Sequence, residues 1–197
     1  MAETTAEIVL FDGFDELDAI GPYEVLENGA RAGASLETRL VTLTETDLVT
    51  ASHGLRVEPD GTLGEPDILL VPGGGWTTDG GVRAAVEDGA LPTAVGERAA
   101  TGSTIASVCT GAMVLAEGGV LEGRPATTHA VAKGDLKGYA ADVHDARVVD
   151  DGDVLTAGGV TAGIDLALWL LEREFGAAIA EAVETEMEHE RRVEVVR

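Results

Sequence analysis

The chain has 197 residues, 45% of them apolar, with 36 acidic and 13 basic side chains and a net charge of −23. A chain of this length can bury enough apolar surface to fold as one domain, so we expect a single domain over residues 1–197. Contacts to phosphates need clustered Lys and Arg, and the acidic excess therefore argues against nucleic-acid binding. Because the chain has no apolar N-terminal segment and no run of eighteen apolar residues, we expect neither a signal peptide nor a membrane span, and a cytoplasmic location.

The acidic side chains are spread along the whole chain, and Lys133 and Lys137 are the only lysines. In molar salt the Debye length falls to about 3 Å, which screens the repulsion between carboxylates that themselves hold water and counter-ions. Nowhere do five like charges follow one another, so the sequence does not indicate an acidic tail. We interpret the charge as an adaptation of the surface to concentrated salt, a halophilic feature.

Short apolar runs alternate with amphipathic stretches along the chain, which predicts an α/β fold with a mainly parallel sheet sandwiched by helices. In chain order we expect a strand at 7–11, a helix at 15–27, a hairpin of 40–44 with 48–51, a strand at 68–71, helices at 82–88 and 94–100, a strand at 104–108, a helix at 110–117, a hairpin of 148–149 with 154–155, and a helix at 162–175.

Cys109 is the only cysteine, and it stands where an expected strand turns into a helix. In an open α/β sheet functional groups gather beyond the carboxyl ends of the strands, and Ser107-Val108-Cys109-Thr110-Gly111 has the pattern of a nucleophile elbow. The N-terminus of the following helix can lower the pKa of the thiol from about 8.5 to below neutrality. We therefore interpret Cys109 as a nucleophile, against the alternative of a small core residue.

A glycine-rich loop, Pro72-Gly73-Gly74-Gly75, ends another buried strand at the same edge of the sheet. Glycine lets the backbone approach a ligand closely, and the amides of Gly74 and Thr110 could together form an oxyanion hole, with Gly75 as a further substrate-binding candidate. The alternatives are a plain turn and a phosphate loop, and the latter is disfavoured because no Gly-Lys-Ser/Thr follows.

Four segments of the chain resemble the ThiJ/PfpI superfamily, which has the class I glutamine amidotransferase-like fold. They are FDELDAIGPYEVL (14–26), LLVPGGGW (69–76), ASVCTGAMVLAEGGVLEGRPATTH (106–129) and LTAGGVTAGIDLALWL (155–170). The last two, with LDxxGPYEVL, are most similar to the isonitrile hydratase branch. The resemblance implies a flavodoxin-like fold, a homodimer and a reaction on a small molecule that needs no cofactor.

The resemblance also implies roles for individual residues. Cys109 would be the nucleophile, Asp18 its proton-transfer partner, Glu24 a support for the first helix, and His129 a nearby histidine. From the residues alone, Asp18 could equally be a helix cap, and His129 could satisfy buried backbone groups. Thr110 stands where protease-like members have a histidine, which counts against protease or glutaminase activity.

We expect a cysteine-dependent hydration of a small electrophile, with an isonitrile as the leading substrate and an N-substituted formamide as the product. Ala130 stands where the hydratase branch usually has an aromatic residue, so the substrate pocket departs from that pattern. The alternatives are glyoxalase or deglycase chemistry on α-oxoaldehydes, and a redox sensor or ligand-binding module that uses Cys109. No pair of side chains has metal-ligand spacing on an expected helix, so we expect no metal.

Overall fold

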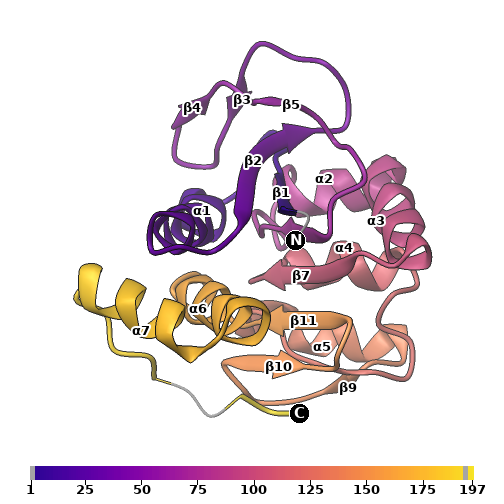
Figure 1. Cartoon of the computed structure of the whole chain (residues 1–197). Helices are drawn as coiled ribbons and strands as arrows, with labels where there is room; N and C mark the ends of the chain where they lie inside the picture. Colours follow the sequence, from indigo (N-terminus) through magenta and orange to yellow (C-terminus); the bar gives the residue numbers. More distant parts are fainter. Residues whose placement is uncertain (1–2, 193–194) are drawn as a thin grey trace.

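A seven-stranded sheet runs through the centre of the protein in the order β10-β11-β7-β6-β1-β2-β5 (Figure 1). The computed structural model describes residues 3–192 and 195–197. The strands of this sheet are β1 (Thr4–Val9), β2 (Leu36–Thr42), β5 (Gly61–Thr62), β6 (Ile68–Val71), β7 (Thr104–Val108), β10 (Val148–Asp150) and β11 (Val154–Ala157). Neighbouring strands are parallel except β10 and β11, which confirms the predicted α/β class.

Helices cover both faces of the sheet (Figure 1). One group consists of α1 (Glu16–Arg31), α6 (Ala162–Phe175) and α7 (Ala177–Glu186), and the other of α2 (Gly81–Asp88), α3 (Ala90–Thr101), α4 (Gly111–Glu117) and α5 (Lys133–Leu136). Successive residues of β1 belong to different cores, because side chains alternate across a strand: Ile8 packs in the core of the first group and Val9 in that of the second. The sheet therefore has two buried faces.

The remaining elements are short. They are the strand pairs β3 (Val49–Thr50) with β4 (Arg56–Val57) and β8 (Pro125–Ala126) with β9 (Asp142–Val143), and the 3₁₀ helices η1 (Ala130–Ala132) and η2 (Lys137–Tyr139). Among the helices that the structure describes, none has the length and apolar character needed to cross a membrane.

The predicted hairpin of residues 40–44 and 48–51 is wrong. Residues 40–42 belong to β2, which lies between β1 and β5 and is parallel to both, while Val49–Thr50 pairs with Arg56–Val57. An isolated hairpin is at best marginally stable, whereas β2 packs against α1 when it joins the sheet. The second predicted hairpin is confirmed, since β10 and β11 are antiparallel neighbours.

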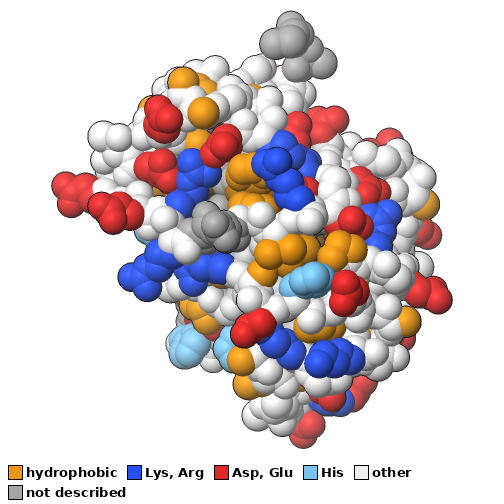
Figure 2. Space-filling model, turned by 90° about the horizontal axis from the view of Figure 1, so that it is seen from below, with side chains coloured by type: hydrophobic (Ala, Val, Ile, Leu, Met, Phe, Trp, Pro, Cys, Tyr) orange, Lys and Arg blue, Asp and Glu red, His pale blue; other side chains and the backbone are white. Residues whose placement is uncertain are grey.

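Charged side chains of both signs lie on the face of the molecule that Figure 2 shows. On the face shown in Figure 2, Asp and Glu side chains alternate with Arg and Lys and surround small apolar patches. This distribution matches the even spread of acidic residues along the sequence.

Candidate active site

Cys109 occupies a tight turn between β7 and α4. Its φ is +59°, in the left-handed region that side chains other than glycine rarely adopt, and its N–H donates to the carbonyls of Ala157 and Gly158 at 3.1 and 3.0 Å. Gly111 makes the turn fit, because a Cβ at this position would lie 2.3 Å from the carbonyl oxygen of Val71. The turn has the strained geometry of a nucleophile elbow, and it holds Cys109, which is 7% exposed, at the carboxyl end of the sheet.

Asp18 lies on the first turn of α1 and points into the same site. It is completely buried, its Oδ2 accepts a hydrogen bond from Gly73 N at 3.0 Å, and within the described residues its Oδ1 has no hydrogen-bond partner of good geometry. Asp15, not Asp18, caps the helix, because its Oδ1 accepts from Leu17 N at 3.2 Å. The alternative of Asp18 as a helix cap is therefore wrong.

Gly73 separates the carboxyl of Asp18 from the turn at Cys109. A Cβ on this residue would lie 2.6 Å from Asp18 Oδ2, 2.8 Å from Cys109 Cβ and 2.8 Å from Thr110 N. Real Cβ atoms essentially never come this close to other atoms, so the carboxyl and the thiol reach one another only across a glycine.

The carboxyl and the thiol face each other in a buried site, and the pKa values of both groups are raised. Burial, and then the charge of Asp15, raise the pKa of Asp18 from 3.8 to about 7, although the Cys109 thiol and Gly73 N–H partly oppose this. Burial, and then the charge of Asp18, raise the pKa of the Cys109 thiol to about 12. A carboxyl with a pKa near 7 is suited to proton transfer at neutral pH.

The expectation of a thiol pKa below neutrality is wrong. α4 has only seven residues, and its N-terminus is outweighed by burial and by the neighbouring carboxylate. The resting form is therefore a thiol beside a titrating carboxyl, and the thiol has to lose its proton as it reacts.

Thr110 fixes the glycine-rich loop. Its Oγ1 accepts from Gly74 N at 2.9 Å and donates to the carbonyl of Gly74 at 2.7 Å, so one side chain satisfies both polar groups of this residue. The amide of Gly74 is therefore occupied, which contradicts its expected role as an oxyanion donor. Gly75 faces α2 instead, where its carbonyl accepts from Arg83 N at 2.9 Å.

Hydrogen bonds from the backbone N–H groups of Val160 and Thr110 partly lower the pKa of the thiol. Val160 follows β11 and has a φ of +46°, an unusual conformation for a β-branched residue. The site thus combines a thiol, a proton-transfer carboxyl and two fixed donors. This arrangement can stabilise negative charge on the sulfur or on an atom bound to it.

The sequence profile of the DJ-1/PfpI family matches residues 4–173. The chain belongs to this family. An isonitrile hydratase of Pseudomonas putida is 38% identical over 186 residues, which cover 92% of this chain and 76% of that protein. Protein DJ-1alpha of Drosophila melanogaster is 27% identical over 184 residues, covering 90% of this chain and 81% of that protein.

Solved structures of the DJ-1/PfpI family have the same fold. A ThiJ/PfpI family protein from Pseudomonas syringae superposes with a TM-score of 0.86 at 28% identity, covering 98% of this chain and 78% of that one. Drosophila melanogaster DJ-1beta superposes with a TM-score of 0.85 at 24% identity, covering 97% and 100%. These comparisons confirm the flavodoxin-like fold that the resemblance implied.

His129 borders the site, and within the part of the chain that the structure describes it has no hydrogen bond to the thiol. Its N–H and the hydroxyl of Thr128 donate to the carbonyl of Cys109 at 3.4 and 2.8 Å, and its Nδ1 accepts from Val131 N at 3.2 Å. Its ring packs against Gly159, where a Cβ would lie 2.4 Å from the ring. These contacts agree with the alternative that His129 satisfies backbone groups. His129 also lines a cleft of about 390 Å³ with Lys133, Asp145 and Arg147.

Glu24 does not join the site. Its side chain is exposed on α1, while the residues of this helix that face the protein include Asp18, Pro22 and Val25. The expected support of the helix by Glu24 is therefore not what the described contacts show.

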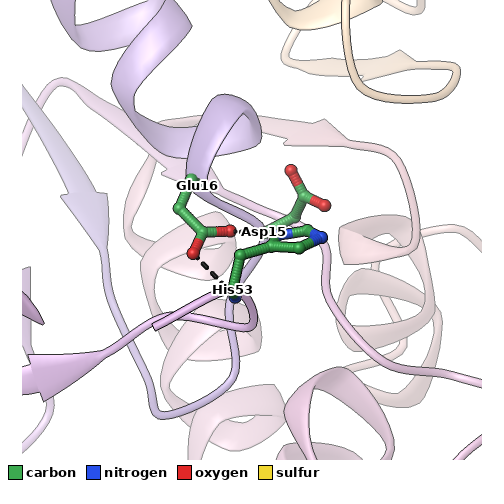
Figure 3. Close-up of side chains that lie close together, drawn as sticks. All are labelled: Asp15, Glu16 and His53. Carbon is green, nitrogen blue, oxygen red and sulfur yellow. Dashed lines mark hydrogen bonds and ion pairs between the residues drawn. The ribbon is translucent and has the colours of Figure 1, made fainter. Parts of the chain in front are cut away.

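A second group of titratable side chains surrounds the start of α1. Ligand-type atoms of Asp15, Glu16 and His53 all lie within 4.8 Å of one another (Figure 3). This cluster does not follow from the sequence pattern, because His53 comes from the loop after β3 and is distant from Asp15 and Glu16 along the chain. The groups satisfy one another: Asp15 caps the helix, and Glu16 Oε2 lies 2.6 Å from His53 Nδ1. Burial would raise the pKa of Glu16, but hydrogen bonds from His53 lower it to about 2, and we derive no metal from this cluster.

Two features of the site were not predicted from the sequence, the charge of Asp15 and a backbone N–H of Val160. The charge of Asp15 acts on Asp18, and a spacing of three residues on an expected helix would have placed them one turn apart. Val160 contributes a backbone N–H, and only the two glycines before it hinted at an unusual turn.

Proposed function

We propose that this protein hydrates an isonitrile, R–N≡C, to an N-substituted formamide, with Cys109 as nucleophile and Asp18 as proton carrier. The observation that carries the proposal is the buried thiol facing a buried carboxyl whose pKa is raised to about 7. The similarity to the isonitrile hydratase of Pseudomonas putida supports the class of substrate.

In the first step the sulfur attacks the terminal carbon of the isonitrile. Because the pKa of the thiol is about 12, its proton moves to the Asp18 carboxylate during the attack. Asp18 then delivers that proton to the same carbon. One C–S bond and one C–H bond form, one C–N π bond is lost, and the product is a thioimidate, R–N=CH–S–Cys109.

In the second step water adds to the thioimidate carbon, with the Asp18 carboxylate as general base. The nitrogen gains a proton, the C–S bond breaks, and the sulfur leaves with a proton as the thiol. The released product is R–NH–CHO, and water is the only co-reactant. The N–H groups of Thr110 and Val160 stabilise the sulfur while it carries negative charge.

Thr110 contributes through the loop that it holds. Its hydroxyl binds both polar groups of Gly74, which keeps Gly73 N–H directed at Asp18 Oδ2. The carboxyl therefore remains on the sulfur side of the loop, where proton transfer needs it.

The test is a turnover assay in molar KCl with cyclohexyl isonitrile, in which the formamide is followed by NMR. We expect formamide from the parent protein and none above background from Cys109→Ser. Methylglyoxal is the second substrate, with lactate as its product. A folded protein that forms lactate but no formamide would favour the α-oxoaldehyde alternative, and one that forms neither would favour a sensor or binding module.

We also propose that the chain forms a homodimer, as its resemblance to the family implied. Light scattering after size exclusion would then give twice the 20.2 kDa mass of one chain. A mass of one chain at micromolar concentration, in molar KCl, would contradict this part of the proposal.

A further inference from the structure

Arg147, just before β10, holds the turn that follows β11 at two points. Its carbonyl accepts from Gly158 N at 2.9 Å, and its Nη2 donates to Thr161 Oγ1 at 3.0 Å. The two contacts lie on either side of Val160, and the turn itself lies against Cys109, whose N–H donates to the carbonyl of Gly158 at 3.0 Å. A hydrogen bond from the Val160 N–H partly lowers the pKa of the Cys109 thiol. Arg147 therefore fixes both ends of the segment that presents this donor.

Arg147 is itself held by a buried carboxylate. Asp165, near the start of α6, is 1% exposed; its Oδ2 accepts from Arg147 Nε, and its Oδ1 lies 2.8 Å from Nε2 of His189. A carboxylate buried this deeply is costly unless it is well paired, and here both oxygens are used. The guanidinium consequently has little freedom to leave Thr161.

The segment between these contacts is strained. Val160 has a φ of +46°, and a residue in such a conformation persists only where its surroundings hold it, at a cost of about 1–3 kcal/mol. The carbonyl of Val160 also accepts one of the first hydrogen bonds of α6, from Gly163 N at 3.3 Å. Without a clamp the segment would relax, and the N–H would turn away from the sulfur.

We propose that Arg147 is a positioning residue that keeps the Val160 N–H on the sulfur of Cys109. The proposal rests on the proposed role of Cys109 as nucleophile. A donor fixed on the sulfur favours the charged form, so its loss makes the thiol harder to ionise and slows its attack on any electrophile. Arg147 and Thr161 act on the sulfur through Val160.

The test measures the rate at which iodoacetamide alkylates Cys109 at a fixed pH in molar KCl. For Arg147→Gln we expect a rate about tenfold lower than that of the parent, the usual worth of one hydrogen bond to a charged group. A merely structural role predicts the opposite sign, because a loosened turn exposes the sulfur and speeds alkylation. If the isonitrile is a substrate, the kcat of Arg147→Gln should fall together with the alkylation rate, while its KM is unchanged.

Two further pairs of variants sharpen the test. Thr161→Val removes the contact to the guanidinium and leaves the buried ion pair intact, whereas Thr161→Ser retains the hydroxyl and should keep the parent rate. Arg124→Gln is the matched control, because Arg124 pairs with Asp151 and Asp153 near the opposite end of β11. Should Arg147→Gln fail to fold, the Thr161 pair decides.

Parent-like or faster alkylation in folded Arg147→Gln, or in Thr161→Val, would overturn the proposal. Because alkylation needs no isonitrile, it remains informative if the proposed function fails. Slower alkylation with no isonitrile turnover would reject the proposed substrate and keep the positioning role.

Discussion

Asp18 and Cys109 exchange one proton in the proposed reaction, and the pKa of Asp18 sets the pH range of activity. The reaction starts from a carboxylate and a thiol, so kcat/KM should rise with pH through about 7 and then level off, far below the pKa of about 12 of the thiol. Asp15→Asn keeps the helix cap but removes the charge that raises the pKa of Asp18, which should move the rise to lower pH. An unchanged pH profile in this variant would show that another group controls the rate.

The same carboxyl should also make stability depend on pH. Its folded pKa of about 7 lies above its ordinary value of 3.8, so between these values the folded state binds more protons than the unfolded state. This contribution to stability is present at low pH and is lost as pH rises towards 7. Asp18→Asn removes the effect, and the Tm of the variant relative to the parent should therefore increase from pH 4 to pH 8. A Tm difference that stays constant over this range would contradict the buried, titrating carboxyl.

At the scale of elements, α1 and α6 pack closely at a glycine. A Cβ on Gly29 would lie 2.4 Å from Cδ2 of Leu171, which is fully buried. Gly29→Ala should destabilise the protein by about 1–3 kcal/mol through overpacking, and Leu171→Ala by about 2–5 kcal/mol through a cavity. Because the new methyl group fills part of that cavity, the double variant should lose less than the sum in urea unfolding. Gly134→Ala, with no atom within 4 Å of its Cβ, is the control, and strict additivity would show that the helices do not touch there.

The elements also show how far the sequence predicts this molecule. The turn at Cys109 follows from a local pattern, a strand followed by a helix. The place of Asp18 beside it was implied only by the family resemblance, because an acid near a helix start could equally cap the helix. The position of β2 between β1 and β5 does not follow from a local pattern, because the pairing of a strand depends on segments that are distant in the chain. The occupied Gly74 amide and the clamp at Val160 depend on side chains far apart in the chain, such as Thr110 and Arg147.

At the scale of the whole molecule, the net charge of −23 should make stability depend on salt. Unscreened carboxylates repel one another at low ionic strength, whereas molar KCl shortens the Debye length to about 3 Å. The Tm should therefore be higher in molar KCl than in a low-salt buffer, and the buried pair of Arg147 and Asp165 should change little. Equal Tm values at both salt concentrations would contradict the interpretation of the surface as adapted to salt.

The proposed reaction depends on a covalent bond between Cys109 and the isonitrile carbon. Intact-mass spectrometry of the parent protein, quenched during turnover of cyclohexyl isonitrile, measures that bond directly. We expect an added mass equal to one isonitrile molecule on the parent and none on Cys109→Ser. Formamide production by Cys109→Ser at the parent rate, with no adduct on either protein, would contradict it.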